Sequence, residues 1–303
     1  MDNLTHSLVG ALIGQTGLKK KTGLAMPALI IGANLPDVDA ACFFWLEGTE
    51  HLGFRRGITH GPPALILLPL ILAGLLWGWD RWQASRGKRP EGRVPVHFGW
   101  LYGLAFLGAL THPALDWLNV YGIRFLEPFS SQWFYGDTLF IIDLFLWVLM
   151  GFGLWFSLRK EKRGGDWQEL ARNVLSIAGI YIVLNFAISQ YDKAQNASYV
   201  ASISSPPPVF FWQRETIGIG GADNYFIDGE RVGNAPLSAC DLDAARASSS
   251  QIEAFLFWSR APVLDLTGEG TYILGDARFY DPRSRDRFSI AIPTEFCTEP
   301  APG

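Results

Sequence analysis

Several short stretches of the chain place histidine or aspartate inside or beside apolar runs. They read NLTHSLVG, ANLPDVD, RRGITHG, THPALDW and GDTLFIID, and they contribute His6, Asp37, Asp39, His60, His112, Asp116, Asp137 and Asp143. Imidazole nitrogens and carboxylate oxygens are the usual ligands of zinc and similar divalent ions. His112 and Asp116 are spaced i, i+4, so one face of a helix presents both. These residue types predict a cation site if the fold gathers them.

Two arginines, Arg55 and Arg56, precede His60 in the stretch RRGITH, which stands before the apolar run at 64–79. Beside a metal, a guanidinium binds a phosphate through two parallel hydrogen bonds, and we predict this substrate-binding role for Arg55 and Arg56. The alternative is that both arginines anchor the chain to lipid headgroups. Further polar groups near the same stretches are predicted to orient the ligands or the substrate: Asn34, Thr59, Asn119, Tyr121 and Asp143.

The composition excludes an ordinary soluble protein of this size. Of the 303 residues, 49% are hydrophobic and 18% are charged. The formal net charge of −4 gives no reason to expect a nucleic-acid partner. Lysine and arginine concentrate in short segments between apolar runs, as they do in membrane proteins.

A membrane-spanning helix needs about 20 predominantly apolar residues. The sequence predicts five or six such spans, because the segment nearest the N-terminus is short. The candidate segments are 4–18, 24–46, 63–79, 98–118, 138–158 and 170–190.

The basic loops orient these spans, because cytoplasmic loops carry an excess of lysine and arginine. Loops 80–97 and 159–169 and residues 19–21 are basic and are assigned to the cytoplasm, which places both termini outside. This orientation brings every histidine and aspartate within the spans to the outer side. An unpaired charge within a span costs about 2.5–3.5 kcal/mol on insertion scales. A bound divalent cation, most simply zinc, removes that cost for the whole group.

Two prolines predict breaks in the helices that carry these residues. Pro36 disfavours helix at the residue before it, so an unwound stretch is expected around Asp37 and Asp39. Pro113 is expected to mark a break with a new helical start at His112. His51 and His97 lie in ordinary loops and are not expected to be ligands.

The character of the sequence changes near residue 195. We predict a membrane-embedded helical domain over 1–194 and a small β-rich extracytoplasmic domain over 195–303, with a helical stretch at 239–258. Cys240 and Cys297 both fall in this second domain. In a compartment that permits disulfides they either form a bridge or remain two unpaired thiols.

The stretches quoted above, together with PPPVFFW and FLFWSRAPVL, resemble the YdjM-type family, which is described as LexA-regulated, membrane-bound, metal-dependent hydrolases. The order of the ligands is also similar to that of zinc-dependent phospholipase C and P1 nuclease. That resemblance implies metal ligands at His6, Asp37 or Asp39, His60, His112 and Asp116. The further HxxxE pair of those enzymes is absent from this sequence, so one or two ions are expected rather than three.

The expected function is hydrolysis at the outer face of a bacterial cytoplasmic membrane. The expected ligands are His6, Asp37, Asp39, His60, His112 and Asp116, with Asp39 or Asp137 as the general base. A site at headgroup depth suits a phospholipid or another lipid-linked phosphoester. One alternative is a non-catalytic protein, either an ion transporter or a metal sensor. Another is that residues 195–303 form the functional domain and the membrane region only anchors it. The absence of an internal repeat counts against a transporter.

Overall fold

The computed structural model describes residues 1–207, 209, 212–221 and 224–298. Two compact units divide this chain. The first comprises residues 1–38, 56–187 and 206–212, and the second comprises residues 39–55, 188–205 and 213–303. The predicted boundary at 194/195 is close to this division, although residues 39–55 join the second unit. Part of the PPPVFFW stretch and of the C-terminal end lies outside the described residues.

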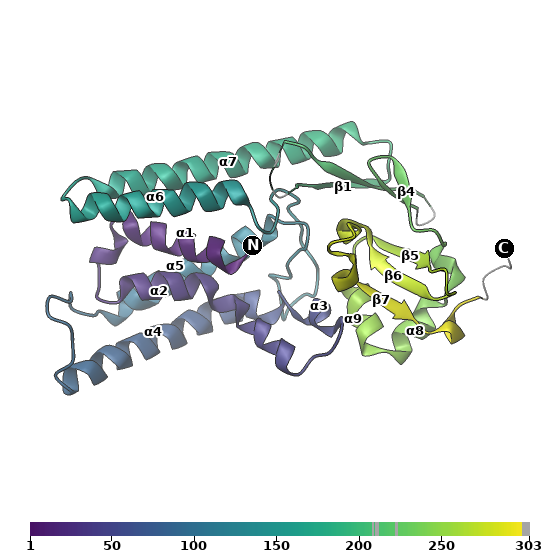
Figure 1. Ribbon diagram of the computed structural model, residues 1–303. Coiled ribbons are helices and arrows are strands. Elements are labelled where there is room, and N and C mark those ends of the chain that lie inside the picture. Colours follow the sequence, from purple (N-terminus) through teal and green to yellow (C-terminus); the bar gives the residue numbers. More distant parts are fainter. Residues whose placement is uncertain (208, 210–211, 222–223, 299–303) are drawn as a thin grey trace. The chain divides into compact units, whose positions relative to one another are not determined.

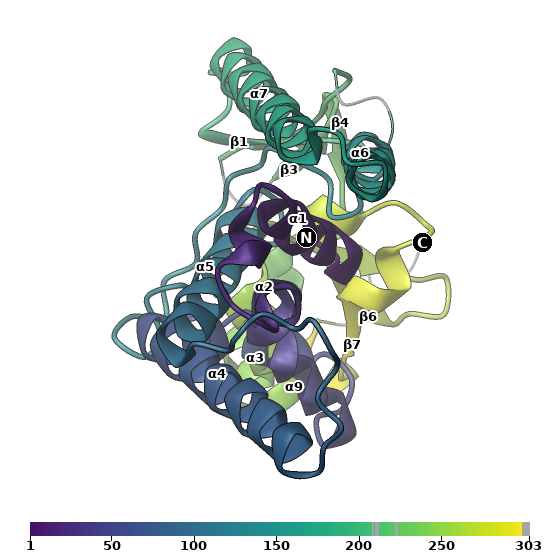
Figure 2. The ribbon, with the colours of Figure 1, turned by 90° about the vertical axis from the view of Figure 1, so that its left-hand side faces the viewer.

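The first unit is a bundle of helices that correspond to the predicted apolar segments. Figure 1 shows the long helices running side by side, and Figure 2 shows α6 nearly end-on. The helices are α1 (Asn3–Gln15), α2 (Ala25–Asn34), α4 (Pro62–Ser85), α5 (Phe98–Trp117), α6 (Leu144–Lys162) and α7 (Trp167–Gln195). One apolar core joins α1, α6 and α7, and a second joins α2, α4 and α5.

The two prolines near the predicted ligands behave differently. Helix α2 ends at Asn34 and a 3-10 helix, Leu35–Phe44, follows it, which confirms the predicted loss of α-helix before Pro36. The break predicted at Pro113 is wrong, because α5 continues through that residue to Trp117. Pro113 is buried, so packing of its ring offsets the hydrogen bond that its missing N–H removes.

Glycines allow α1, α2 and α5 to approach one another closely. A Cβ atom added at Gly108 of α5 would lie 2.6 Å from the Leu29 carbonyl oxygen of α2. One added at Gly32 of α2 would lie 2.5 Å from the Ala105 carbonyl oxygen of α5. Small residues permit this kind of backbone contact between membrane helices. The contact fixes the spacing between α5, which carries His112 and Asp116, and α2, which leads into the segment that carries Asp37.

Three helical segments in the described part of the chain are long and apolar enough to cross a membrane: Ala25–Phe44, Pro62–Ser85 and Trp167–Gln195. The structure therefore supports three candidate spans and not the five or six that were predicted. Helix α1 is short, α5 carries His112 and Asp116 in its last turns, and α6 ends in the charged sequence RKEK. Apolar side chains on α4, such as Ile66, Leu67, Ile71 and Leu75, are exposed, as lipid-facing residues are.

The second unit contains two small antiparallel sheets. Strands β1 (Ala201–Ser205), β2 (Glu215–Ile219), β3 (Tyr225–Ile227) and β4 (Glu230–Val232) form one sheet in that order. Strands β5 (Pro262–Leu266), β6 (Tyr272–Asp276) and β7 (Ser289–Ile292) form the other. The short helices α3 (Glu50–Phe54), α8 (Leu242–Ser248) and α9 (Ser250–Trp258) belong to this unit, and Gly53 of α3 packs against Ala254 of α9. The predicted β-rich character of this region is confirmed.

A disulfide and a buried ion pair hold the second unit together. Cys240 and Cys297 form a disulfide. Arg278 pairs with Asp276, and both side chains are fully buried beside the ring of Trp258. Burial raises the pKa of Asp276, but the charge and hydrogen bonds of Arg278 and the Ser259 hydroxyl outweigh burial, so the pKa lies below its usual value.

The glycine contact between α2 and α5 leads to a matched pair of substitutions. Gly108→Ala forces a methyl group against the Leu29 carbonyl and should destabilise the protein by about 1–3 kcal/mol. Gly103→Ala on the same helix meets no atom within 4 Å, and should stabilise it by about 0.5–1 kcal/mol through helix propensity. Thermal unfolding in mild detergent measures both. Equal changes in the unfolding temperature of the two variants would contradict the proposed close contact between α2 and α5.

Candidate metal centre

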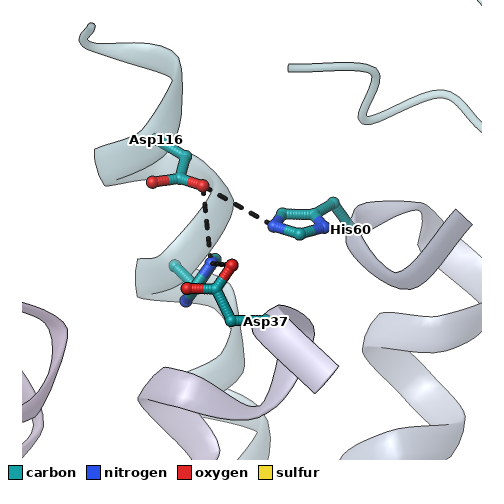
Figure 3. Close-up of side chains that lie close together, drawn as sticks. Asp37, His60 and Asp116 are labelled. Carbon is teal, nitrogen blue, oxygen red and sulfur yellow. Dashed lines mark ion pairs between the residues drawn. The ribbon is translucent and has the colours of Figure 1, made fainter. Parts of the chain in front are cut away.

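Four side chains in the first unit come together as a group able to hold a metal ion. They are Asp37, His60, His112 and Asp116, and one ligand atom from each lies within 4.8 Å of every other. Figure 3 shows Asp37, His60 and Asp116 turned toward one another from separate helical segments. The 3-10 helix supplies Asp37, a second 3-10 helix (Ile58–His60) supplies His60, and α5 supplies the i, i+4 pair.

Three of the separations within the group are close to those of ligands around one ion. His112 Nε2 lies 3.7 Å from Asp37 Oδ1 and 3.5 Å from Asp116 Oδ2, and His60 Nε2 lies 3.6 Å from Asp116 Oδ2. These distances are too long for good hydrogen bonds. In a tetrahedral zinc site with bonds of about 2.0–2.1 Å, geometry places two ligand atoms about 3.3–3.4 Å apart. The donor set therefore fits a zinc-like cation.

A backbone contact fixes the protonation pattern of His112. Its Nδ1 lies 2.7 Å from the Ala33 carbonyl oxygen, which accepts the ring proton. The proton on Nδ1 leaves a lone pair on Nε2, the nitrogen that faces both carboxylates. Nε2 is buried and has no hydrogen-bond partner among the described residues. A lone pair held in this way is the state that a metal ligand requires.

His6 extends the group on the other side of Asp116. Its ring stacks on that of His112 with centroids 3.8 Å apart, and its Nε2 lies 3.3 Å from Asp116 Oδ1. The Met1 amino nitrogen also contacts Asp116 Oδ1. His6 is fully buried, and neither ring nitrogen has a hydrogen-bond partner among the described residues. Asp116 thus presents one oxygen to His60 and His112 and the other to His6.

Arg56 contacts the same carboxylate. Its Nε lies 3.1 Å from Asp116 Oδ2, and its Nη1 donates to Asn119 Oδ1 at 2.9 Å. The guanidinium lies over the Tyr121 ring, 4.6 Å from its centroid. Arg56 is 5% exposed and has a φ of 57°, in the left-handed region that side chains rarely adopt. The structure therefore connects Arg56, Asn119 and Tyr121, all predicted to bind substrate, with the ligand Asp116.

The remaining predicted residues are not members of the four-residue group. Asp39 is buried and pairs with Arg55, with 3.4 Å between carboxylate oxygen and Nε, and both belong to the second unit. Asp137 is fully buried with a φ of 50°. The amides of Gly136 and Thr138, on either side of it, donate to Trp117 and Leu118, so Asp137 is held beside the end of α5.

Of the residues predicted to orient the ligands, Thr59 contacts a member of the metal group, whereas Asn34 and Asp143 make contacts between helices. The Thr59 hydroxyl lies 3.0 Å from His60 Nδ1, so it helps to direct Nε2 toward Asp116. Asn34 donates to Ser7 and to the Ile30 carbonyl. Asp143 caps α6 through the Leu146 amide and accepts from the Tyr181 hydroxyl of α7 at 2.8 Å. The contacts of Asn34 and Asp143 join helices.

One contributor to the site gives no signal in the sequence. The Ala33 carbonyl selects the tautomer of His112, yet any residue has a carbonyl, so only the approach of α2 to α5 reveals this contact. In the sequence, only the glycines at positions 32 and 108 indicate that α2 and α5 pack closely.

The sequence profile of the family described as YdjM inner membrane protein matches residues 1–193. The chain belongs to this family. The match spans the helices of the first unit and all four residues of the metal group. No curated protein and no solved structure matches the chain. The similarity to zinc-dependent phospholipase C and P1 nuclease is not shown by these comparisons.

The geometry leads to a prediction for metal content. Purified protein should carry a divalent ion, and His60→Ala and Asp116→Ala should each lower its affinity by at least about tenfold, because each removes a donor from the group. His97→Ala is the matched control, since His97 lies outside the group at the start of α5. Elemental analysis and zinc titration measure the effect. Unchanged metal binding in both ligand variants would exclude the site.

Proposed function

We propose that this inner membrane protein is a metal-dependent hydrolase that acts on a phosphoester or another lipid-linked substrate at the outer face of the membrane. The observation that carries the proposal is the group Asp37, His60, His112 and Asp116, whose ligand atoms lie within 4.8 Å of one another and of which three side chains are buried. A metal site built only to stabilise a fold uses a closed set of ligands. Here Asp37 is 10% exposed, whereas the other three side chains are fully buried. The substrate is therefore expected to approach on the side of Asp37.

The donor set favours zinc, because it combines neutral imidazoles with carboxylates. A divalent ion bound there would polarise the scissile phosphoester and lower the pKa of a water molecule. His6 and the second oxygen of Asp116 provide donors for a second ion beside the first, so we propose one or two ions.

The charges around the site support an anionic substrate. Asp37 and Asp116 balance one divalent ion, and the guanidinium of Arg56 then leaves the surroundings net positive. A phosphoester brings the negative charge that such surroundings attract. Arg56 is held by Asp116 and Asn119, so we propose that it positions the ligand Asp116 as well as contributing this charge.

Two aspartates remain candidates for the general base. Asp137 lies in the same unit as the metal group, beside the end of the helix that carries Asp116. Asp39 is two residues from Asp37 and is held by Arg55. Either carboxylate would accept the proton that a water molecule loses as it attacks the phosphoester.

The second candidate function is metal transport or sensing without catalysis. It is favoured by one observation, the burial of His6, His60, His112 and Asp116 in the interior of a helical bundle. The cluster lies at the outer ends of its helices in the proposed orientation, and ion pathways in transporters centre on the midplane. We therefore rank it second.

We also propose a multi-pass topology with both termini outside the cytoplasm. The basic ends of α4 and α6 and residues Lys19–Lys21 would face the cytoplasm. Helices α1, α5 and α6 would lie in the membrane with the three candidate spans. The disulfide between Cys240 and Cys297 agrees with an external second unit, because disulfides persist in oxidising compartments.

The hydrolase proposal predicts metal-dependent turnover. Protein in vesicles of phosphatidylglycerol should release a phosphorus-containing product, lose this activity with a chelator and regain it with zinc. Asp116→Ala should reduce turnover by at least about a hundredfold. The result would favour metal transport instead if zinc-loaded protein moves zinc across the vesicle membrane. In that case it should cleave neither this lipid nor soluble phosphodiesters.

The role of Arg56 is tested in the same assay. If it positions Asp116, Arg56→Ala should lower zinc affinity together with turnover, and Arg56→Lys should restore affinity only in part, because lysine lacks the planar fork. If Arg56 instead binds substrate alone, Arg56→Ala should raise KM and leave zinc affinity intact. Arg124→Ala is a useful control, since Arg124 is also buried but pairs with Glu127.

The topology is tested by cysteine labelling in intact cells, in a Cys42→Ser background. Cysteines at Ser85 and Lys162, in the last turns of α4 and α6, should react only after the membrane is permeabilised. A cysteine at the exposed Ser250 should react with an impermeant reagent at once. External labelling at Ser85 would invert the orientation.

A further inference from the structure

The second unit contains a polar hollow that no part of the proposed hydrolase uses. Its volume is about 450 Å³, and it is lined by residues from the end of β4, from the β5–β6 hairpin and from residues 280–285. Two arginines line it, Arg231 and Arg285, together with Asp265 and Tyr280. All of these residues lie within one compact unit.

The carboxylate in this hollow is already engaged. Asp265 is 7% exposed and accepts hydrogen bonds from the Tyr280 hydroxyl at 2.9 and 3.1 Å, from the Asn234 amide at 3.2 Å and from Arg285 Nη2. A carboxylate with so many donors is a poor ligand for a cation. Its function here is to hold Tyr280 and Arg285 in place.

The contacts of Arg285 orient its guanidinium. One nitrogen binds Asp265, and the plane lies over the Tyr280 ring at 4.5 Å from the centroid. Stacking and the ion pair together hold Arg285 in one conformation. Its side chain therefore loses less entropy when a ligand binds. The side chain is still 33% exposed, so its other N–H groups remain able to reach a ligand.

Arg231 supplies the second guanidinium. It is exposed at the middle of β4 and forms no ion pair among the described residues. Asp265 neutralises one of the two arginines, so the hollow retains net positive charge. Gly233, with a φ of 80°, turns the chain directly after β4 toward the hairpin, which brings Arg231 and Asp265 to one hollow.

We propose that this hollow is a binding site for a phosphate group, either free or as a monoester. Two guanidiniums at one polar hollow match the oxygens of a phosphate through charge-assisted, bidentate hydrogen bonds. The site is independent of the metal group and of the hydrolase proposal.

The test is isothermal titration of the full-length, metal-depleted protein in detergent with inorganic phosphate, glycerol 3-phosphate and succinate. Arg231→Gln should weaken phosphate binding by about tenfold or more, since it removes a charge-assisted contact. Arg231 forms no ion pair among the described residues, so this variant should fold normally. Arg285→Lys keeps a charge beside Asp265 and should still weaken binding. Arg287→Gln, in the same 3-10 helix but outside the hollow, should bind as the wild type does.

The ligands identify the source of the phosphate. Tighter binding of glycerol 3-phosphate assigns the site to a monoester, and tighter binding of phosphate assigns it to the free ion. No detectable binding, equal binding by Arg231→Gln and wild type, or a preference for succinate would each overturn the proposal. Metal depletion keeps these results separate from the metal centre, whatever the outcome of the hydrolysis assay.

Discussion

The fully buried carboxylate of Asp116 is the constraint on which the first unit depends. A carboxylate in an apolar bundle is costly unless opposite charges or hydrogen-bond donors surround it. His6 approaches it from α1, Arg56 and His60 from the segment before α4, and His112 from the preceding turn of α5 itself. Each of those segments must therefore reach the same point. A bound cation would add to this convergence, because it would draw Asp37 and the lone pairs of the imidazoles into the same shell.

Close helix packing is the second requirement, and it follows from the first. His112 can offer Nε2 to a metal only if its Nδ1 meets the Ala33 carbonyl, which lies on α2. That contact needs α2 and α5 at backbone distance, which Gly32 and Gly108 permit. Residues without any reactive group thus decide which nitrogen of a ligand is available. The site is as much a property of the helix interface as of its donors.

Much of the site can be predicted from the amino-acid sequence, for an identifiable reason. Histidine and aspartate are rare in apolar helices, so His60, His112 and Asp116 stand out by residue type alone. The direction in which a side chain points cannot be predicted from residue type in this way. Arg56 adopts a left-handed backbone conformation that turns it toward Asp116, and nothing in RRGITH indicates this φ. Strand β1, ASISS, is not predicted because its partner β2 lies beyond the proline-rich stretch and its own alternation is weak.

The same chemistry explains why the number of spans is difficult to predict. Helix α5 is 20 residues long and apolar over most of its length, but it is not among the segments that meet the length and composition requirement for a span. The residues that lower its apolar character, His112, Pro113 and Asp116, include two members of the metal group. Helix α6 likewise begins only at Leu144, directly after Asp143, whose carboxylate caps it and accepts a hydrogen bond from Tyr181. His112 and Asp116 thus lie on a helix whose polar residues keep it below the requirement for a simple span, whereas Asp37 lies in Ala25–Phe44, which meets that requirement.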